Sequence, residues 1–327
     1  MILGLIAGFA LAPVLLSHDV YSYVDYARLG VVHGLDPYVH PPAAAPFDPA
    51  YARVTWIDAT SAYGPLFTLA TYPLAWLPVS TAVAALKATA ALSVLGVAVL
   101  VFRIAPSRGV APLAAAAFVA LNPLVLIHVV GGAHNDGLAM LAATLGLAAM
   151  LSAREATAGA AFVAAFAIKL PAAIAAPFAF LGTARRSRLV AGAAAAAGLL
   201  GSVAFVAFGW YWLDAIGLAG ENQHRTSHLS VPITLARITG LDPTAVRAAA
   251  LALYAAAFLY LLAWTRRGND WLRAAAWASF GLLLATAWLL PWYLIWALPL
   301  VALSRDHPLQ LLTLALTAYQ LPARMPL

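Results

Sequence analysis

The chain has 327 residues, 64% of them hydrophobic and 9% charged, against about 25% charged residues in soluble domains, which excludes an ordinary soluble enzyme and predicts a polytopic membrane protein. Its net charge of +6 comes from arginines at the ends of apolar segments, so the charge reports membrane orientation and argues against a nucleic-acid partner. The absence of cysteine excludes disulfides, thiolate metal sites and cysteine nucleophiles.

Apolar segments separated by loops follow one another along the chain. They cover residues 2–16, 64–78, 81–104, 110–130, 137–152, 157–182, 189–210, 244–265, 274–290, 293–304 and 309–320. Only the first loop approaches the size of a soluble domain, about 50 residues, so we predict one membrane domain over residues 1–327 with an all-α, bundle-like fold. No basic residue precedes segment 2–16, which predicts a short inserted helix rather than a cleaved signal peptide.

Arginines predict the orientation, because cytoplasmic loops carry an excess of Lys and Arg. Those assigned to the cytoplasmic side are Arg103, Arg108, Arg154, Arg185, Arg186, Arg188, Arg266, Arg267, Arg273 and Arg305. The loops 17–63, 131–136, 211–243 and 291–292 then lie together outside. This orientation requires 64–78 to be a half-helix or re-entrant segment and 157–182 to be a short hairpin. Simple alternation of full spans would instead place 131–136 inside.

The first external loop, residues 17–63, carries five of the twelve acidic residues. Ser17 is predicted to cap a helix over residues 18–32 that lies along the membrane surface. Asp19 follows directly after the first apolar segment, where a partly desolvated carboxylate can act as a general base toward a hydroxyl, with Asp25 in reserve. A capping aspartate among interfacial tyrosines explains the same helix equally well.

The end of this loop runs from Trp56 to Tyr63-Gly64-Pro65. The Gly-Pro pair predicts a turn into the next apolar segment, and Trp56 and Tyr63 suit the headgroup level of the membrane. We favour this structural interpretation, while the same aromatic residues could form a wall against a sugar or a prenyl chain.

The loop 131–136 ends in three consecutive polar residues, His134, Asn135 and Asp136. Capping the next helix needs only one of them, so we favour a functional role, either holding hydroxyls or a catalytic carboxylate or ligating a metal. Lys169 precedes a proline in an apolar hairpin and is interpreted as an interfacial lysine. Buried phosphate binding by Lys169 is the minority alternative.

The loop 211–243 is most polar in the run Glu221-Asn222-Gln223-His224-Arg225-Thr226-Ser227-His228. Arg225 with His224 or His228 offers a permanent cation and a group that titrates near neutral pH, which suits a lipid-linked phosphate leaving group. A solvated loop in contact with anionic headgroups is the equal alternative.

Trp292 and Tyr293 follow Pro291 at a helix break near the end of the chain. An interfacial aromatic belt is the default interpretation. The more specific alternative is that the two rings form a stacking platform for the sugar or the prenyl chain.

Taken in order, these motifs resemble the bacterial polyprenol-phosphate-mannose-dependent α-mannosyltransferases of the GT-C membrane superfamily. The matching segments are Asp19-Val-Tyr-Ser-Tyr23, Gly34-Leu-Asp-Pro-Tyr38, Trp56 with Tyr63-Gly-Pro-Leu66, Asn122-Pro123, Gly131-Gly-Ala-His-Asn-Asp136 and Pro291-Trp-Tyr293. Each motif alone is weak, but their common order over most of the chain is fairly specific.

The resemblance implies that Asp19 activates the acceptor hydroxyl and that the sugar leaves a polyprenyl phosphate with inversion. His134 and Asp136 would then support the sugar or the base, and Arg225 with His224 or His228 would bind the phosphate. The residues expected to contact substrate are Tyr23, Tyr63, His134, Asn135, Asp136, His224, Arg225, His228, Trp292 and Tyr293. No cofactor or metal site is expected, although a divalent metal is not excluded.

The sequence therefore predicts an inverting glycosyltransferase, multi-pass in the cell membrane and surrounded by its lipids, with its active site on the external face. It would move a hexose, mannose by resemblance, from a polyprenyl-phosphate donor to a glycolipid or glycan acceptor. A transporter of polyprenyl-linked sugars is one alternative, although transporters commonly show related halves and midplane polar sites. A non-catalytic assembly subunit is another.

Overall fold

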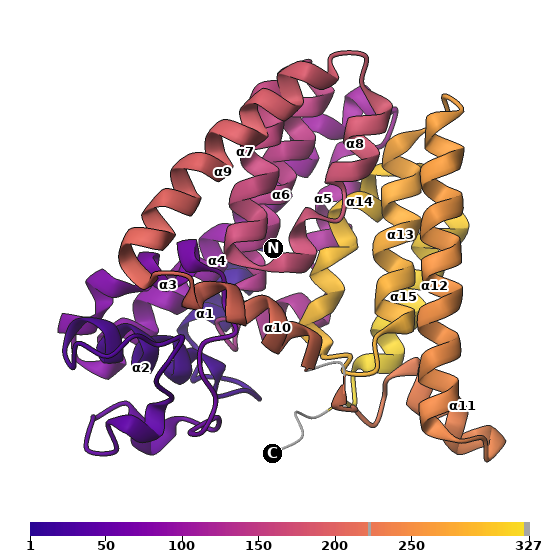
Figure 1. Ribbon diagram of the computed structural model, residues 1–327. Coiled ribbons are helices and arrows are strands. Elements are labelled where there is room, and N and C mark those ends of the chain that lie inside the picture. Colours follow the sequence, from indigo (N-terminus) through magenta and orange to yellow (C-terminus); the bar gives the residue numbers. More distant parts are fainter. Residues whose placement is uncertain (222–223, 324–327) are drawn as a thin grey trace.

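The computed structural model describes residues 1–221 and 224–323, and these residues form helices and loops without a strand (Figure 1). The α-helices are α1 Ile2–Leu11, α2 Asp19–Val31, α3 Pro65–Thr71, α4 Val79–Ile104, α5 Pro112–Ala120, α6 Asp136–Leu151, α7 Glu155–Ile168, α8 Ala176–Gly182, α9 Arg186–Phe208, α10 Asp214–Glu221, α11 Val231–Thr239, α12 Pro243–Arg266, α13 Trp271–Ala285, α14 Leu298–Leu303 and α15 His307–Gln320. Asn222 and Gln223, part of the predicted polar run, lie outside the described residues. The prediction of an all-α polytopic membrane protein is confirmed.

Three helical stretches in the described part of the chain are long and apolar enough to cross a membrane, namely Val79–Arg108, α9 and α12. The helices pack side by side in the order α9, α7, α6, α4, α5, α14, α13, α12. In Figure 1, α9 and α12 form opposite flanks of the molecule, and α10 crosses between the two sides. Large apolar side chains on both flanks, such as Val206 and Leu253, are exposed, which suits contact with lipid.

Glycines allow a close contact between helices α7 and α9. A Cβ atom on Gly159 would overlap the backbone of Leu189, and one on Gly192 would overlap the backbone of Ala156. Small residues that let two helix backbones approach closely are typical of packing inside membranes, where no hydrophobic effect drives association.

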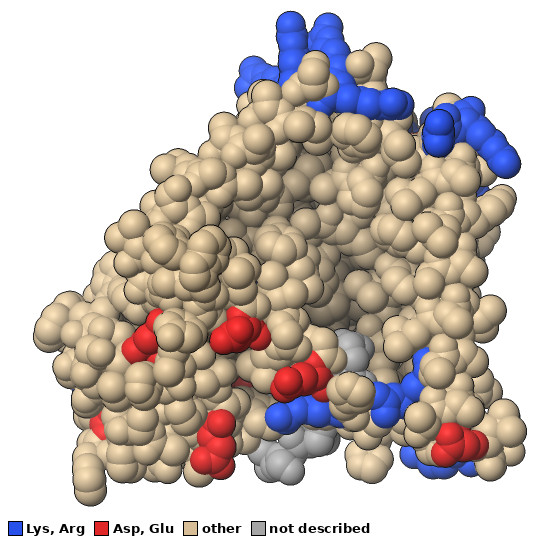
Figure 2. Space-filling model, viewed as in Figure 1, with Lys and Arg blue, Asp and Glu red and all other residues tan. Residues whose placement is uncertain are grey.

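The arginine-rich loops are joined by ion pairs. Arg108 pairs with Asp270, Arg273 Nε lies 2.8 Å from Asp306 Oδ2, and Arg185 contacts Glu155 at 3.8 Å. In Figure 2, one end of the molecule shows Lys and Arg without visible Asp or Glu, whereas the other end shows Asp and Glu together with further Lys or Arg. The predicted cytoplasmic location of the arginine-rich loops stays a prediction.

The helix predicted over residues 18–32 is α2, whose N-cap is His18 and not the predicted Ser17, although the Asp19 N–H donates to Ser17 Oγ at 3.2 Å. Most of its residues are buried, on both faces, because α3, α4 and the 3₁₀ turn Tyr72–Trp76 pack against it. The helix is therefore enclosed by protein and does not present an open polar face.

The two segments predicted to be interrupted are interrupted at prolines. Segment 64–78 forms the short helix α3 and the 3₁₀ turn Tyr72–Trp76, and segment 157–182 forms α7, the 3₁₀ turn Leu170–Ala173 and α8. Glu155 at the start of α7 contacts Arg185, which follows the end of α8. The two ends of segment 157–182 therefore lie close together, as expected for a hairpin.

Segment 110–130 differs from the continuous apolar segment predicted, because α5 ends at Ala120 and a π-helical turn, Val125–Val130, follows. Asn122 Oδ1 accepts the N–H of Leu124 at 3.0 Å, and its amide donates to Thr317 Oγ1 at 3.0 Å. Pro123 cannot donate a backbone hydrogen bond, so this asparagine side chain stabilises the break.

Candidate active site

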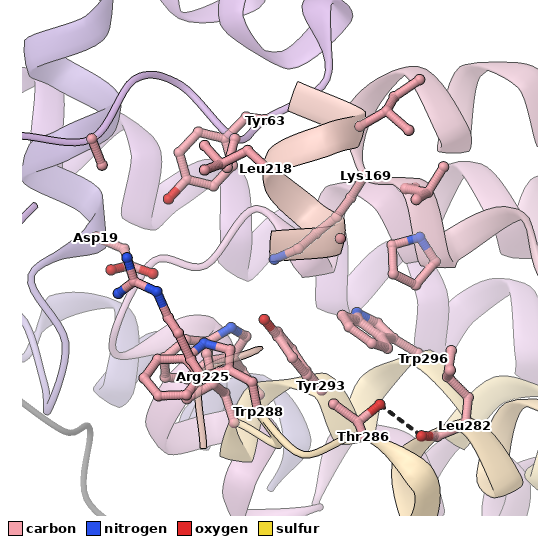
Figure 3. Close-up of a pocket in the computed structure, with 18 of the residues that line it drawn as sticks. Asp19, Tyr63, Lys169, Leu218, Arg225, Leu282, Thr286, Trp288, Tyr293 and Trp296 are labelled. Atoms are coloured by element: carbon pink, nitrogen blue, oxygen red, sulfur yellow. Dashed lines mark hydrogen bonds between the residues drawn. The ribbon is translucent and has the colours of Figure 1, made fainter. Parts of the chain in front are cut away.

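A cavity of about 510 Å³ lies among the first loop, the turn after α7, α10, α12, α13 and the segment before α14. Five of the predicted site residues line it: Asp19, Tyr63, Arg225, Trp292 and Tyr293. Figure 3 shows the Lys169 amine and the hydroxyls of Tyr63 and Tyr293 pointing into this space. The cavity therefore combines a carboxylate, two cations and several aromatic rings.

Two backbone contacts bring the first loop to this place. The Leu15 N–H donates to Gly131 O at 3.2 Å, which holds the segment before α2 against the loop 131–136. The Gly64 N–H donates to Ile168 O at 3.1 Å, and a Cβ on Gly64 would overlap the backbone of Ala167. The glycine predicted as a turn residue is therefore required for contact with the end of α7.

Asp19 is the first residue of α2, and it is 8% exposed. Trp56 Nε1 donates to its Oδ1 at 3.3 Å, and His134 Nδ1 lies 3.6 Å from its Oδ2. Burial raises the pKa of Asp19 to about 6, although the Lys169 charge and the Trp56 N–H act in the opposite direction. A carboxylate with this pKa can take up a proton near neutral pH.

Asp136 lies behind the cavity wall, completely buried at the start of α6. Lys169 Nζ donates to its Oδ2 and Trp296 Nε1 to its Oδ1, both at 2.6 Å. Lys169 itself lines the cavity, 3.4 Å from Asn135 Oδ1 and above the ring of Tyr293. The predicted residues Asn135 and Asp136 thus hold a cation at the cavity wall.

Arg225 reaches the cavity from the loop between α10 and α11. Its guanidinium carbon lies 4.8 Å from the ring centre of Trp56 and 5.9 Å from that of Trp288. Two bonds fix the loop just beyond it: the Ser227 N–H donates to Ala287 O at 2.9 Å, and its hydroxyl donates to Leu289 O at 2.7 Å.

His134 and Tyr23 are buried and pack against residues that line the cavity. The His134 ring stacks on Trp292 with centroids 3.7 Å apart, and Tyr23 packs edge-on against Tyr63 at 4.8 Å. Burial, with the nearby charges of Lys169 and His128, holds the pKa of His134 well below its usual value. His134 is therefore neutral and cannot act as a permanent cation.

Asp25, the reserve base, is not among the residues that line the cavity. It is 1% exposed and lies one helix turn before Arg28, whose Nε binds the Asp48 carboxylate at 2.9 Å. Burial and the Asp48 charge raise the pKa of Asp25 to about 7.

The two histidines proposed beside Arg225 do not join it. His228 lines a separate cavity of about 300 Å³ with Leu289 and Pro291, and His224 is exposed and does not line the larger cavity. Within residues 1–221 and 224–323, there is no group of three or more His, Asp or Glu side chains that could hold a metal ion.

Lys169, Trp56 and Trp296 are the residues at this site that the sequence interpretation underestimated. The signal for Lys169 was present, because a lysine inside an apolar segment is costly unless it is paired or functional. Trp296 and Asp136 are in contact although they lie 160 positions apart in the sequence, and a local sequence pattern cannot predict such a pair.

Comparison with known proteins identifies the family to which the chain is similar. Residues 5–185 match the family described as "Alpha-(1->6)-mannopyranosyltransferase, N-terminal domain". The chain is 31% identical over 339 residues to Alpha-(1->6)-mannopyranosyltransferase A of Mycobacterium tuberculosis, covering 89% of this chain and 63% of that protein. It is 32% identical over 172 residues to the protein of the same name from Corynebacterium glutamicum, covering 51% of this chain and 35% of the relative.

The chain thus spans less than two thirds of the length of these relatives. No solved structure matches it significantly. The family match includes Asp19, Asp136 and Lys169 but ends before Arg225 and Trp292.

Proposed function

The chain belongs to the alpha-(1->6)-mannopyranosyltransferase family, and on this premise we propose that it transfers mannose from a polyprenyl phosphate to a hydroxyl of a glycan or glycolipid. The reaction would take place at the outer face of the membrane, with inversion at the sugar. The names of the relatives suggest an α-(1→6) linkage, which with inversion requires a β-linked donor.

The observation that carries the proposal is the position of Asp19 in a cavity that also holds Lys169 and Arg225. Asp19 is the only carboxylate among the described residues that line it. An inverting transfer needs one base and a binding site for the leaving phosphate, and this cavity offers one carboxylate and two cations.

In the proposed step, the acceptor oxygen attacks C1 of the mannose while Asp19 takes the hydroxyl proton. The bond between C1 and the phosphate oxygen breaks, and its electron pair stays on that oxygen. The developing negative charge would be stabilised by the Lys169 ammonium and the Arg225 guanidinium. Asp136 holds the Lys169 side chain at the cavity wall through their 2.6 Å contact.

Apolar side chains of the cavity lining suit an isoprenoid chain. They include Leu170 and Pro171, which follow Lys169 in the chain, Leu251 of α12 and Leu282 of α13. A lipid phosphate bound at Lys169 could extend its chain along these apolar side chains, while its sugar points toward Asp19.

The test is transfer from polyprenyl-phosphate mannose to a mannoside acceptor by purified protein in detergent or vesicles. Asp19→Asn should lower the rate about 10²- to 10⁴-fold, because it removes a general base. Asp58→Asn, in the same loop but exposed, is the matched control and should keep the rate. Wild-type rates in folded Asp19→Asn, or lipid flipping without transfer, would contradict the proposal.

A further inference from the structure

Trp56 contacts both the candidate base, Asp19, and one of the two cations that line the cavity, Arg225. Its indole N–H donates to Asp19 Oδ1 at 3.3 Å, and its ring lies 4.8 Å from the guanidinium carbon of Arg225. We propose that Trp56 is a positioning residue that couples Asp19 to Arg225, so that the base and the donor-phosphate site are ordered together. This inference rests on the proposed function.

The loop that carries Trp56 is fixed to the helix that carries Asp19. Tyr26 of α2 donates its hydroxyl to Ala59 O at 2.7 Å, three residues beyond Trp56. The Ala43 N–H donates to Ile57 O at 2.8 Å. The indole is therefore held at a defined place relative to α2, and its N–H can select one orientation of the Asp19 carboxylate.

The N–H and the ring face act on the two partners in different ways. The indole N–H can only donate a hydrogen bond, so it favours the ionised form of Asp19, the form that accepts a proton. The ring face attracts a cation, and it does so best when water is partly excluded. No hydrogen bond or ion pair to another described residue holds the Arg225 guanidinium. Its N–H groups are therefore available for phosphate oxygens.

Trp288 provides a matched comparison. Its ring also lies near Arg225, at 5.9 Å, but Trp56 is the tryptophan that donates to Asp19. Loss of Trp288 should therefore disturb the cation without disturbing the base. Trp56→Phe has the opposite effect. It keeps the aromatic face against Arg225 and removes the N–H that donates to Asp19.

The experiment measures the base and the donor site separately. Dicyclohexylcarbodiimide modifies protonated buried carboxyls, so the pH midpoint of Asp19 labelling, followed by mass spectrometry, reports its protonation without any catalysis. Trp56→Phe should move this midpoint upward by about 0.5 to 1 pH unit. Trp288→Leu should leave it unchanged. Asp25, in the same helix, is the internal reference and should keep its midpoint in every variant.

The donor site is read from KM for polyprenyl-phosphate mannose. Trp56→Leu and Trp288→Leu should each raise KM about 3- to 10-fold, the effect of a lost cation–π contact, whereas Trp56→Phe should raise it less than Trp56→Leu. An unmoved Asp19 midpoint in Trp56→Phe, or an unchanged KM in Trp56→Leu, would overturn the coupling.

Failure of the proposed function has a different signature. In that case the wild-type protein would transfer no mannose, yet the labelling midpoints of Asp19 would still be measurable in all variants. If the Asp19 midpoint shifts in Trp56→Phe but the wild-type protein transfers no mannose, the contact between Trp56 and Asp19 is supported and the glycosyltransferase function is rejected.

Discussion

Lys169 Nζ lies 2.6 Å from Asp136 Oδ2, and this ion pair joins the end of α7 to the start of α6 at the cavity wall. Asp136 has no exposed surface, whereas 17% of the Lys169 side chain is exposed. The carboxylate is therefore sealed in the protein and the ammonium faces the cavity. A buried charge is tolerated only when it is paired and hydrogen-bonded, and Trp296 supplies the second hydrogen bond to Asp136.

Removing Lys169 should affect stability and transfer together. Lys169→Met leaves Asp136 buried with only the Trp296 N–H, which should cost about 3 kcal/mol of unfolding free energy and abolish most transfer. The double variant Lys169→Met/Asp136→Asn removes both charges, so it should regain much of the stability but none of the transfer. Thermal unfolding and transfer rate measure the two effects. Recovery of activity in the double variant would show that Lys169 only neutralises Asp136.

The pH dependence of transfer should follow the protonation of Asp19. Burial raises its pKa to about 6, and only the ionised form can accept the acceptor proton. Below pH 6, kcat/KM should fall about tenfold for each pH unit, and above pH 7 it should no longer depend on this group. The measurement is kcat/KM with the free acceptor varied between pH 5 and 8. A profile that is flat down to pH 5 would be incompatible with Asp19 as the base.

The orientation in the membrane can be tested with single cysteines, because the natural chain contains none. Phe47 lies in the first loop and is 99% exposed, and Ser187 lies exposed in the arginine-rich end. In intact cells, Phe47→Cys should react with a membrane-impermeant maleimide, and Ser187→Cys should react only after the membrane is permeabilised. The reverse pattern would place the cavity on the cytoplasmic side.

Much of the fold could be predicted because membrane segments can be recognised from their apolar composition. Long apolar runs gave α4, α9 and α12, and prolines marked where 64–78 and 157–182 are interrupted. The enclosure of α2 could not be predicted, because its tyrosines and aspartates show no pattern that separates a protein-covered helix from one at the membrane surface.

The site was predicted in part for a similar reason. Asp19, Tyr63, Arg225, Trp292 and Tyr293 stand in polar or aromatic loops, and these loops meet at the cavity. Lys169 was underestimated because its partner Asp136 lies 33 positions away, and sequence spacing gives no measure of that approach. His224 and His228 were placed beside Arg225 because they are neighbours in sequence, but Ser227 is fixed to Ala287 and Leu289 and His228 faces another cavity.

Gly64 should tolerate no side chain. A Cβ there would overlap the carbonyl of Ala167, and a backbone atom cannot move aside as a flexible side chain can, so Gly64→Ala should cost about 1 to 3 kcal/mol by overpacking. It should also lower transfer, since the displaced α7 end carries Lys169. Gly198→Ala, in α9 with open space around it, is the control and should be neutral or slightly stabilising. Equal thermal stability of the two variants would refute the close contact.

Replacing Asp25 should stabilise the protein in a way that depends on pH. The pKa of Asp25 is raised to about 7 in the folded protein from an ordinary value of 3.8, chiefly by burial. Below the ordinary pKa of 3.8, Asp25 is protonated in both the folded and the unfolded protein, and it does not change the stability with pH. As the pH rises from 3.8 to about 7, the carboxyl ionises in the unfolded protein before it does so in the folded protein, so the free energy of unfolding falls. Asp25→Asn should therefore gain stability progressively between pH 4 and 7, reaching roughly 2 to 4 kcal/mol and staying constant above.

Asp48 gives the opposite sign and serves as the comparison. Its bonds to Arg28, the Ala50 N–H and His33 outweigh burial and lower its pKa, so its carboxylate stabilises the fold at all pH values above its ordinary pKa. Asp48→Asn should be less stable than the natural protein at both pH 5 and pH 8. Thermal unfolding of both variants across this range decides the matter, because a gain for Asp25→Asn that is equal at pH 5 and pH 8 cannot come from the titration of a buried carboxyl.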